Sequence, residues 1–593
     1  MKDYKPKKNR FRGKIDVLLQ SCCLLVMIVL LNQVCKYYIT TEVLQDMEEE
    51  IPAVRILESE ESKAIENISF AIRQNRFNRR GADTEIDLWQ DANGQKFLFL
   101  PSAASDRLFL VVPEGDQIWI DGMAYTEGEN VNLVPGEHYL QLFENMPEEK
   151  IIVLQSGGLG TIFLDTESGS LEQLQADKEH QETGEYTVFD QDGDCIAASK
   201  LSAINCRGNV SFLDTDKKSY SLKLSQEENL FGMGHAAHWA LIANAFDPSL
   251  LRNQTNFQMA KAGNVAYTPE SQYVDLYING EYQGNYLLME KVEIHDSRIH
   301  VKNLEKETEH MNPEVVYSED DYFVEQKNDI QEEKGVLIEN QPVDITGSYI
   351  LELEASWRYP NVTSGFITAA GQHMEIESPE LASKEQVAYI AEFYQDFENA
   401  LFASDGKNEK GIYHTDYVDL DSFAKKYILE ESIKNLDASV TSQYMVKLSN
   451  AEGGVLVSGT PWDYDKTLGA EVDWAYGYDI SDPNGFYVNE PQVDYDFWHA
   501  LYTHPDFVNR VKELYKSDFR DAILEQVTNG ITKRADLIQT SAVMNGYRWE
   551  LYKNEGVNRT LSKQEIEQAY KRETEKIQRF LMKRISFLDE NWG

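Results

Sequence analysis

The spacing of apolar and polar residues divides the chain into a strand-rich first part and a helix-rich last part. Between residues 85 and 155, short apolar runs such as KFLFL, QIWIDG and HYLQLF alternate with polar residues, and turn sequences such as DANG and PGEH separate them. Alternation of this kind is typical of half-buried β-strands. We therefore expect a small all-β domain at residues 85–155, in which no set of residues suggests catalysis.

Strand patterns continue from residue 156 to about residue 360. In the run SYSLKLS, residues 219–225, the apolar side chains face one way and Lys223 faces the other. Residues 274–294 alternate on either side of an Asn-Gly pair, which is the strongest short-range signal for a β-hairpin. This part of the chain is therefore expected to consist mainly of strands.

The pattern changes to helical spacing beyond residue 380. SKEQVAYIAEFYQDFENALFA repeats apolar residues every three or four positions, and a second helix is expected to follow an Asp cap and to end at Asn435. The last 100 residues are helical in pattern and are expected to support the core. A shorter helix is expected to open earlier, at Asp247-Pro248. The acidic residues 305–345 are expected to form an irregular insertion.

The N-terminus combines positive charge with a long apolar run. Residues 1–14 contain seven Lys or Arg residues and one Asp, and Val17 to Val34 is apolar except for four polar residues. A membrane-spanning helix needs about 20 mostly apolar residues, and Lys and Arg stay on the cytoplasmic side. We expect a basic cytoplasmic tail at residues 1–14, a transmembrane anchor at 15–36 and an acidic stalk at 37–84.

An anchor of this kind makes the chain a single-pass protein of the cell membrane, with its N-terminus in the cytoplasm and its bulk outside the cell. A cleaved signal peptide is the alternative. No small-residue cleavage motif follows Leu31, so the sequence favours the uncleaved anchor.

Composition and charge exclude some functions. The 593 residues are 42% apolar and 26% charged, which is an ordinary globular composition and long enough for about three domains. The net charge is −44, from 56 basic and 100 acidic residues. Because such a surface repels phosphate backbones, nucleic acid is not expected as a partner.

Only Cys195 and Cys206 lie outside the apolar N-terminal segment and its flank. They are expected to flank a hairpin, and in an oxidising compartment they could form one disulfide. Neither belongs to a CxxC motif, so structural zinc is not expected.

The segment GTPWDYDKTLG, residues 459–469, places Asp463 and Asp465 two positions apart. On an extended segment, alternate side chains point to the same side. Two carboxylates aimed together suit Mg²⁺, which takes oxygen ligands from one or two carboxylates and from phosphates. The alternative is a solvated turn, because acidic residues are abundant in this chain.

Asp437 lies directly after a predicted helix and extends the hypothesis from metal binding to phosphoryl transfer. A phosphoryl-transfer site needs a cation near the phosphates, carboxylates for the metal and an acidic residue for the attacking hydroxyl. Lys223, or Lys218 as the alternative, could supply the cation, in the chain order of a protein kinase. However, the GxGxxG, HRD and DFG motifs of ordinary kinases are absent from the sequence.

Several segments resemble one known family. INCRGNVSFLDTDKKSYSLKL resembles the RGN…KKSY…L signature of the CotH kinase family, the spore-coat protein H-like atypical protein kinases. SLLRNQ, LYINGEYQGNYLLMEKV, KNLDASVTSQYMVK and GTPWDYDKTLG agree with the same family in the same order. The resemblance covers roughly residues 157–520.

The resemblance implies a fold and an activity. The fold class would be α+β, a divergent protein-kinase-like two-lobed domain at residues 156–593, with a β-rich lobe at about 156–360 and a helical lobe at about 380–593. The activity would be transfer of phosphate from ATP, with Mg²⁺ or Mn²⁺, to Ser or Thr of a partner protein.

The resemblance also implies roles for particular residues. The nucleotide-binding residues would be Arg207, Gly208, Asn209, Ser211, Lys218, Lys223, Met289 and Glu290. Asp437 and Lys223 would be catalytic, and the metal-binding residues would be Asp463, Asp465 and Ser442. Ser442 departs from the kinase pattern, in which an Asn at this place binds the second metal ion.

The residues also permit plainer roles. Lys223 on a half-buried strand needs a partner, which could be Glu290 or Asp463 in a salt bridge. Arg252 could equally be an ion-pair partner, and Trp462 and Tyr464 are expected in the core. The competing function is therefore a catalytically weak or inactive kinase-like surface scaffold, which Ser442 favours.

Overall fold

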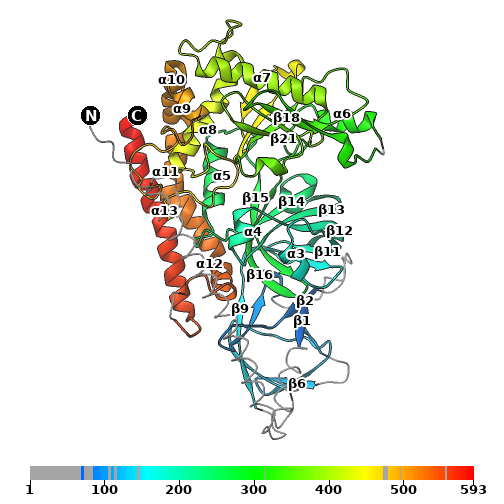
Figure 1. The fold of residues 1–593 in the computed structure, drawn as a ribbon. Helices are drawn as coiled ribbons and strands as arrows, with labels where there is room; N and C mark the ends of the chain where they lie inside the picture. The colour runs from blue at the N-terminus through cyan, green and yellow to red at the C-terminus, as the bar shows by residue number, and fades with distance from the viewer. Residues whose placement is uncertain are drawn as a thin grey trace, which may run out of the picture. The chain divides into compact units, whose positions relative to one another are not determined.

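A computed structural model of the protein describes residues 68–72, 84–104, 108–112, 117–142, 147–313, 315–471, 479–494, 496–553 and 557–593. They belong to one compact unit, Ile68–Gly593. The predicted tail, anchor and most of the stalk lie outside these residues. In the described part, no helix has the length and the apolar character that crossing a membrane requires. The fold class is confirmed at the level of a mixed α and β architecture (Figure 1).

Two small sheets precede the rest of the fold. The strands are β1 (Ser69–Ile72), β2 (Thr84–Asp87), β3 (Trp89–Gln90), β4 (Lys96–Leu100), β5 (Leu108–Val111), β6 (Gln117–Ile120), β7 (Met123–Thr126), β8 (Gly136–Gln141) and β9 (Glu149–Gln155). The sheet orders are β2-β1-β5 and β3-β4-β9-β8-β6-β7. Phe97 and Phe99 of β4 pack against Tyr547 and Tyr282, with ring centroids 4.8 and 4.9 Å apart. These strands therefore share a core with the following part of the chain.

Seven strands then close into a barrel in the order β10-β11-β12-β13-β14-β16-β15. They are β10 (Gly160–Thr166), β11 (Glu182–Phe189), β12 (Cys195–Arg207), β13 (Ser219–Asn229), β14 (His235–Ile242), β15 (Ser271–Ile278) and β16 (Glu281–Glu290). The predicted alternation along β13 is confirmed, with Leu222 buried and Lys223 exposed. The predicted hairpin is also confirmed, because β15 and β16 pair across Asn279 and Gly280, both with positive φ.

Cys195 and Cys206 do not form the disulfide that the sequence left open, and no hairpin lies between them. Cys195 and Cys206 lie on one continuous strand, β12, where Cys195 pairs with Phe189 and Cys206 pairs with Tyr220. Eleven residues of strand separate the two cysteines by roughly 35 Å, at about 3.3 Å per residue. A disulfide needs Cα atoms within about 7 Å, so these two buried thiols are not joined.

The predicted irregular insertion at residues 305–345 is also wrong. It contains α6 (Leu304–Met311) and the first strands of a sheet with the order β17-β18-β20-β21-β19-β22-β23. The strands are β17 (Tyr322–Gln326), β18 (Glu332–Val336), β19 (Tyr349–Leu353), β20 (Gly365–Ile367), β21 (His373–Ser378), β22 (Gln443–Lys447) and β23 (Leu456–Ser458). Many acidic residues conceal the short strand pattern of YFVEQ in the sequence.

The predicted helices of the last part are present. They are α7 (Lys384–Phe402), α8 (Leu420–Ile433), α9 (Phe497–Tyr502), α10 (Pro505–Leu514), α11 (Arg520–Glu525), α12 (Ile531–Arg548) and α13 (Lys563–Trp592). Ser383 and Gln386 form a capping box at α7, and Asp419 caps α8. These caps agree with the predicted starts because a side-chain oxygen satisfies the open N–H groups of the first turn.

The helix predicted to open at Asp247-Pro248 begins later, at α5 (Arg252–Ala262). Residues 247 to 251 form a turn in which the carboxylate of Asp247 accepts a hydrogen bond from the backbone N–H of Arg252, at 2.8 Å. Arg252 also forms a buried ion pair with Asp247, which confirms the plainer of its two predicted roles. Asp247 therefore acts as a cap from outside the helix.

Candidate active site

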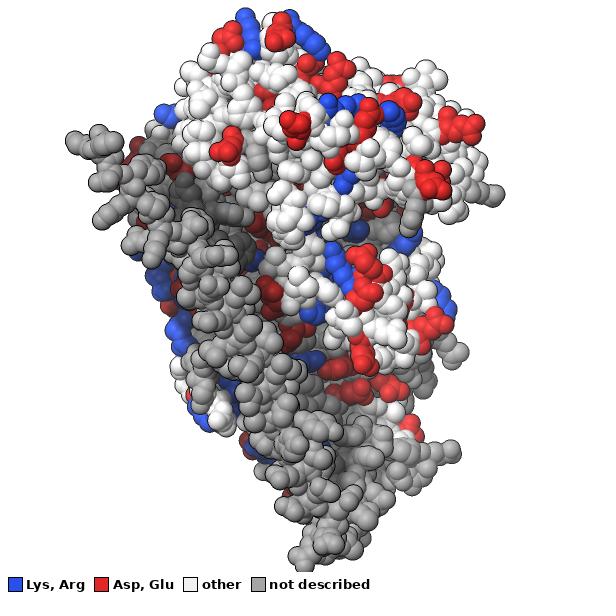
Figure 2. All heavy atoms as spheres, viewed as in Figure 1, with Lys and Arg blue, Asp and Glu red and all other residues white. Residues whose placement is uncertain are grey.

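A cavity of about 590 Å³ lies between the barrel and the seven-stranded sheet. Its walls come from the turn after β12, the ends of β14 and β16, strands β19 and β21, the loop after α8 and the segment 462–466. Charged side chains of both signs gather around this hollow (Figure 2). A cavity of this size is typical of a site for a small-molecule ligand or cofactor.

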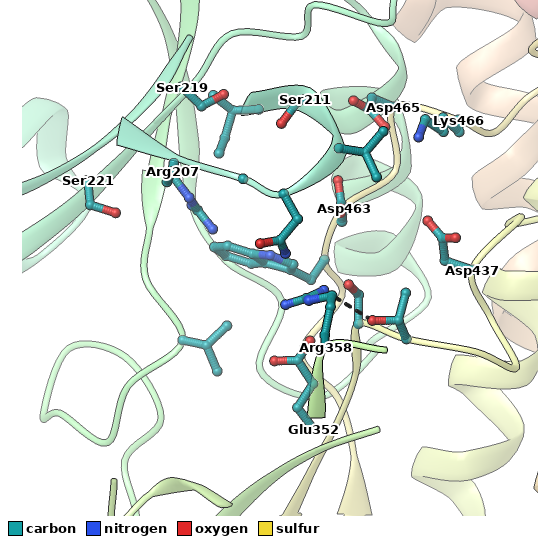
Figure 3. Close-up of a pocket in the computed structure, with 18 of the residues that line it drawn as sticks. Arg207, Ser211, Ser219, Ser221, Glu352, Arg358, Asp437, Asp463, Asp465 and Lys466 are labelled. Carbon is teal, nitrogen blue, oxygen red and sulfur yellow. Dashed lines mark hydrogen bonds between the residues drawn. The ribbon is translucent and has the colours of Figure 1, made fainter. Parts of the chain in front are cut away.

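Asp437, Asp463 and Asp465 all line this cavity. Asp437 follows α8, whose last turn closes with Lys434 in a left-handed conformation. Figure 3 shows the three carboxylates on one side of the pocket and Arg207 on the other. The structure thus brings together three acidic residues that the sequence separates by up to 28 positions.

Burial and the charge of Asp463 raise the pKa of the other two carboxylates. Burial, followed by the charge of Asp463, raises the pKa of Asp437 to about 7. The same two causes raise the pKa of Asp465 to about 8. Like charges held together in a poorly solvated cavity favour protonation, and a divalent cation among them would favour the charged forms. Their oxygens are also the ligands that Mg²⁺ and Mn²⁺ prefer, so the residues present fit such a metal ion.

Helices α5 and α8 hold the segment that carries Asp463 and Asp465. The backbone N–H of Tyr464 donates to Oδ1 of Asn253 on α5, at 2.8 Å. The hydroxyl of Tyr464 donates to Glu430 on α8, at 2.7 Å. Because Tyr464 is buried and fixed at both ends, its two neighbours are held against the cavity. Tyr464 is therefore a core residue, as predicted.

The reason that the sequence offered for pairing these aspartates is wrong. Residues 459–464 form no strand, and Asp463 has a φ of +60°, so the segment is not extended. Both carboxylates reach the cavity because the chain turns there. Left-handed backbone is tolerated by Asp better than by most residues, because its short side chain can bond locally.

The turn after β12 supplies one wall, and its residues Arg207, Gly208, Asn209 and Ser211 all line the cavity. Gly208 has a φ of +92°, and an added Cβ would lie 2.2 Å from Oγ of Ser211, so only glycine fits. The guanidinium of Arg207 lies 4.9 Å from the ring centroid of Trp462, and its buried Nη1 makes no hydrogen bond within the described structure. Arg207 can therefore accept an anionic ligand.

Neither lysine predicted to pair with phosphate lies in the cavity. Lys223 is exposed on β13, two residues beyond Ser221, which does line it. The ammonium group of Lys218 donates to the backbone carbonyls of Phe212 and Thr215, each at 2.5 Å. The prediction for Lys223 is wrong because of its position along the strand. Its side chain faces the same side of β13 as Ser221, but it lies two residues further along, beyond the cavity.

Met289 and Glu290, two of the residues predicted to bind the nucleotide, differ in their position relative to the cavity. Met289 lines the cavity, whereas Glu290 does not. Glu290 accepts from Arg298 at 2.6 Å and from the backbone N–H of Glu270 at 2.9 Å, so it is a structural ion-pair partner. The suggested salt bridge between Lys223 and Glu290 is absent from the described structure. Ser442 lines the cavity with a φ of +57°.

Sequence reasoning missed four cations in the cavity: Lys178, Lys291, Arg358 and Lys466. Lys178 donates to Oδ1 of Asn209 at 2.9 Å, which ties a distant loop to the turn after β12. Lys466 directly follows Asp465, and Lys291 directly follows Glu290, so adjacency to a predicted site residue was the available signal for these two. Lys178 and Arg358 are brought in by tertiary contacts alone.

A second acidic group was also missed. Glu352, Glu375 and Glu377 line the opposite part of the cavity, on β19 and β21. Burial, followed by the charges of neighbouring glutamates, raises the pKa of each of them to about 8. Glu352, Glu354 and Glu375 bring ligand oxygens within 4.8 Å of one another. Glu354 forms a 2.6 Å ion pair with Arg358.

The cavity combines carboxylates whose oxygens fit a divalent cation with an arginine and a glycine-containing turn that fit an anion. The chain belongs to the CotH kinase family, because residues 204–588 match the family described as CotH kinase protein. The match begins near the end of β12 and includes every cavity residue named above except Lys178. No curated protein sequence matches the chain.

Proposed function

We propose that this protein is an atypical kinase that transfers phosphate from ATP to Ser or Thr residues of a partner protein, with Mg²⁺ or Mn²⁺. The observation that carries the proposal is the convergence of Asp437, Asp463, Asp465 and Arg207 on one cavity. Membership of the CotH kinase family supports a kinase-like activity. ATP and a divalent metal follow from the chemistry of the donor groups.

Asp437 is the general base in this proposal. Its pKa, raised to about 7, lies near neutral pH, where a base is most effective at taking a proton from a hydroxyl group. The acceptor hydroxyl would donate a hydrogen bond to the Asp437 carboxylate and lose its proton there as the phosphate–oxygen bond forms. Burial of Asp437 beside Asp463 therefore prepares it for this role.

Asp463 and Asp465 would hold the metal ion, which when bound neutralises charge on the phosphates. Arg207 would contact the phosphate oxygens in place of Lys223, because its buried Nη1 has no protein partner in the described structure. Gly208 lets the backbone of the turn approach the ligand closely. Met289 lies where the base of the nucleotide would contact the end of β16.

The second candidate function is a kinase-like surface scaffold without turnover, and Ser442 favours it. A hydroxyl is a weaker ligand for a hard cation than the amide oxygen that kinases place here. The active form is preferred because holding Asp437 and Asp465 beside the charge of Asp463, which raises the pKa of both, would be a cost without a purpose in a scaffold.

The proposed location is the outer face of the cell membrane, with the catalytic part outside. Its support is the basic N-terminus followed by the apolar run Val17 to Val34. Fusion of residues 1–36 to a reporter that is active only outside the cytoplasm tests this location. A reporter released in soluble form would instead indicate a cleaved signal peptide.

The activity is tested by incubating the purified full-length protein with labelled ATP and with Mg²⁺ or Mn²⁺. Transfer of label to protein acceptors, lost in Asp437→Ala and Asp463→Ala, is the expected result. Asp521→Asn, at an exposed helical position, is the matched control and should keep full transfer. No transfer with either metal, together with no thermal shift on adding ATP, would overturn the kinase in favour of the scaffold.

A further inference from the structure

We propose that the open edge of β17 is a docking site for the acceptor protein, where an extended segment of the acceptor adds to the sheet as a further strand. The inference rests on the proposed function in one respect, because that function makes the bound protein the acceptor of phosphate. The open edge of β17 itself exists whether or not the protein is a kinase. It would place the acceptor beside the catalytic cavity before phosphate is transferred.

The outer edge of β17 is unpaired in the described structure. β17 is the first strand of the seven-stranded sheet and pairs with β18 alone. At the ends of this hairpin, Leu337 donates to the carbonyl of Asp321 at 2.7 Å, and Lys327 donates to that of Gln331 at 2.9 Å. Hydrogen-bonded pairs alternate along an antiparallel ladder, so the odd-numbered residues of β17 bond to β18.

The backbone N–H and C=O groups of Tyr322, Val324 and Gln326 therefore point outward, away from β18. These three are also the residues of β17 with exposed side chains. An extended peptide that approaches this edge would meet three residues able to form a ladder. Main-chain hydrogen bonds of this kind supply affinity in strand addition, and the alternate side chains supply specificity.

Exposed apolar side chains concentrate around this edge. Val324 is 67% exposed and Tyr322 is 43% exposed. The same part of the chain carries further exposed large apolar residues: Val315, Val316, Ile330, Leu337 and Val343. Soluble proteins normally shield an edge strand with charge, proline or a covering element. Apolar residues gathered on an open edge mark a surface that binds another chain.

The register of the sheet connects this edge with the cavity. Val324 pairs with Lys334, Lys334 with Gly365, and Gly365 with Glu375. Paired residues lie on the same face of a sheet, so Val324 shares its face with Glu375, which lines the cavity. Three steps of about 4.8 Å between neighbouring strands place Val324 roughly 14 Å from Glu375.

That separation suits a docking segment followed by a phosphorylated residue. The docked strand would lie one further spacing outside β17, roughly 19 Å from Glu375. An extended chain covers about 3.3 Å per residue, so some six residues would lead from the docked strand to the cavity. The acceptor would therefore carry its docking segment about six or more residues from the Ser or Thr that is modified.

Charge indicates the kind of segment that binds. Residues 319–334 contain seven acidic residues and two lysines, a net charge of −5. A segment that alternates β-branched or aromatic residues with Lys or Arg complements both the apolar face and this charge. A second copy of the chain is disfavoured, because the same acidic edge would face itself and each copy carries a net charge of −44.

The first test measures binding of a fluorescein-labelled 12-residue peptide of alternating Val and Lys to the full-length protein by fluorescence anisotropy. Val324→Pro removes an outward N–H and should raise the Kd at least tenfold. Ala124→Pro is the matched control, because Ala124 lies on β7, the edge of another sheet, and should bind as wild type does. A peptide with Pro at every second position should not bind.

A second readout identifies the surface directly. Peptide binding should slow hydrogen exchange at the amides of Val324 and Gln326. Equal affinity of the wild type and Val324→Pro, or no binding of the Val-Lys peptide, would overturn the proposal. So would a wild-type dimer that Val324→Pro converts to a monomer in sedimentation, because the edge would then belong to a second copy.

The proposed function and the docking edge are tested by separate measurements, so one can fail while the other holds. If ATP causes no thermal shift and no label is transferred, the kinase is refuted, yet the anisotropy result still decides the docking edge. If both hold, extending the peptide by about six residues to a Ser should give a substrate whose KM rises in Val324→Pro while kcat changes little.

Discussion

The cavity contains two acidic groups that the backbone carries in different ways. Asp437, Asp463 and Asp465 stand on turns, and Asp463 is in a left-handed conformation. Glu352 and Glu375 stand opposite each other on the paired strands β19 and β21. Burial and like charge raise the pKa of Asp437 to about 7 and the pKa values of Asp465, Glu352 and Glu375 to about 8.

The two groups differ in what balances their charge. Arg358 forms an ion pair with Glu354 and a 3.3 Å hydrogen bond with Thr441, so the glutamate group has a protein cation fixed beside it. In the described structure no hydrogen bond reaches the carboxylates of Asp437, Asp463 or Asp465. The comparison indicates that one member of the glutamate group, Glu354, is paired within the fold, whereas the aspartates, on which the charge of Lys466 acts, are arranged for a cation that arrives with the ligand.

The largest expected effect separates the groups by activity. Asp463→Asn should lower the rate of phosphate transfer on the order of 1,000-fold, which corresponds to about 4 kcal/mol of transition-state stabilisation. Glu352→Gln should lower it less than tenfold, because the proposed function gives Glu352 no contact with the metal ion or the acceptor hydroxyl. Initial rates with labelled ATP measure both. Equal losses in the two variants would remove the distinction.

The next effect separates the groups by stability. Arg358→Ala leaves the nearly buried carboxylate of Glu354 without its partner and should lower the free energy of unfolding by about 2 kcal/mol or more. Asp463→Asn should leave the metal-free protein as stable as the wild type or more stable, because it removes a repulsion. Urea denaturation measures both. A less stable Asp463→Asn would show that the aspartates are balanced within the fold after all.

A smaller effect concerns pH. The pKa values of Asp437 and Asp465 are about 7 and 8 in the folded state and near 3.8 in the unfolded chain. The folded state therefore binds more protons than the unfolded chain between these values, so the metal-free protein loses stability as pH rises from about 4 to about 8. Stabilisation by Mg²⁺ should increase over the same range, because the metal displaces protons.

Melting temperatures with and without Mg²⁺ across this pH range measure the effect. In Asp463→Asn the loss of metal-free stability should be shallower, because neutral Asn no longer raises the pKa of its two neighbours. A Mg²⁺ effect that is independent of pH would contradict the proposed ligands.

The smallest expected effect is an unchanged activity in a variant of Lys223. Lys223→Ala should change neither the rate nor the KM for ATP by more than about twofold, because an exposed surface side chain contributes little. Arg207→Ala should raise the KM for ATP at least tenfold, because Arg207 lines the cavity. Steady-state kinetics measure both. A large loss of activity in Lys223→Ala would restore the predicted role of Lys223 as a catalytic, nucleotide-binding residue.

Much of the local structure could be predicted because its causes are local. The hairpin at Asn279-Gly280 and the capped starts of α7 and α8 depend on residues within a few positions of each other. The paired aspartates were also found as candidates, because their residues are adjacent in the chain, whereas the turn after β12 was found only through the resemblance to the CotH kinase family. Strand β17 was missed because its acidic neighbours hide a short pattern.

The amino-acid order alone specifies which segments become strands and helices, where helices are capped, and which short motifs carry carboxylates or glycine, because these depend on neighbouring residues. Only the folded chain decides that Lys223 lies outside the cavity while Arg207 and Arg358 lie inside it. It also decides that Cys195 and Cys206 are far apart on one strand. Packing decides how far along a strand a residue lies from the cavity and which distant segments contact it. No pattern of neighbouring residues in the sequence encodes either of these.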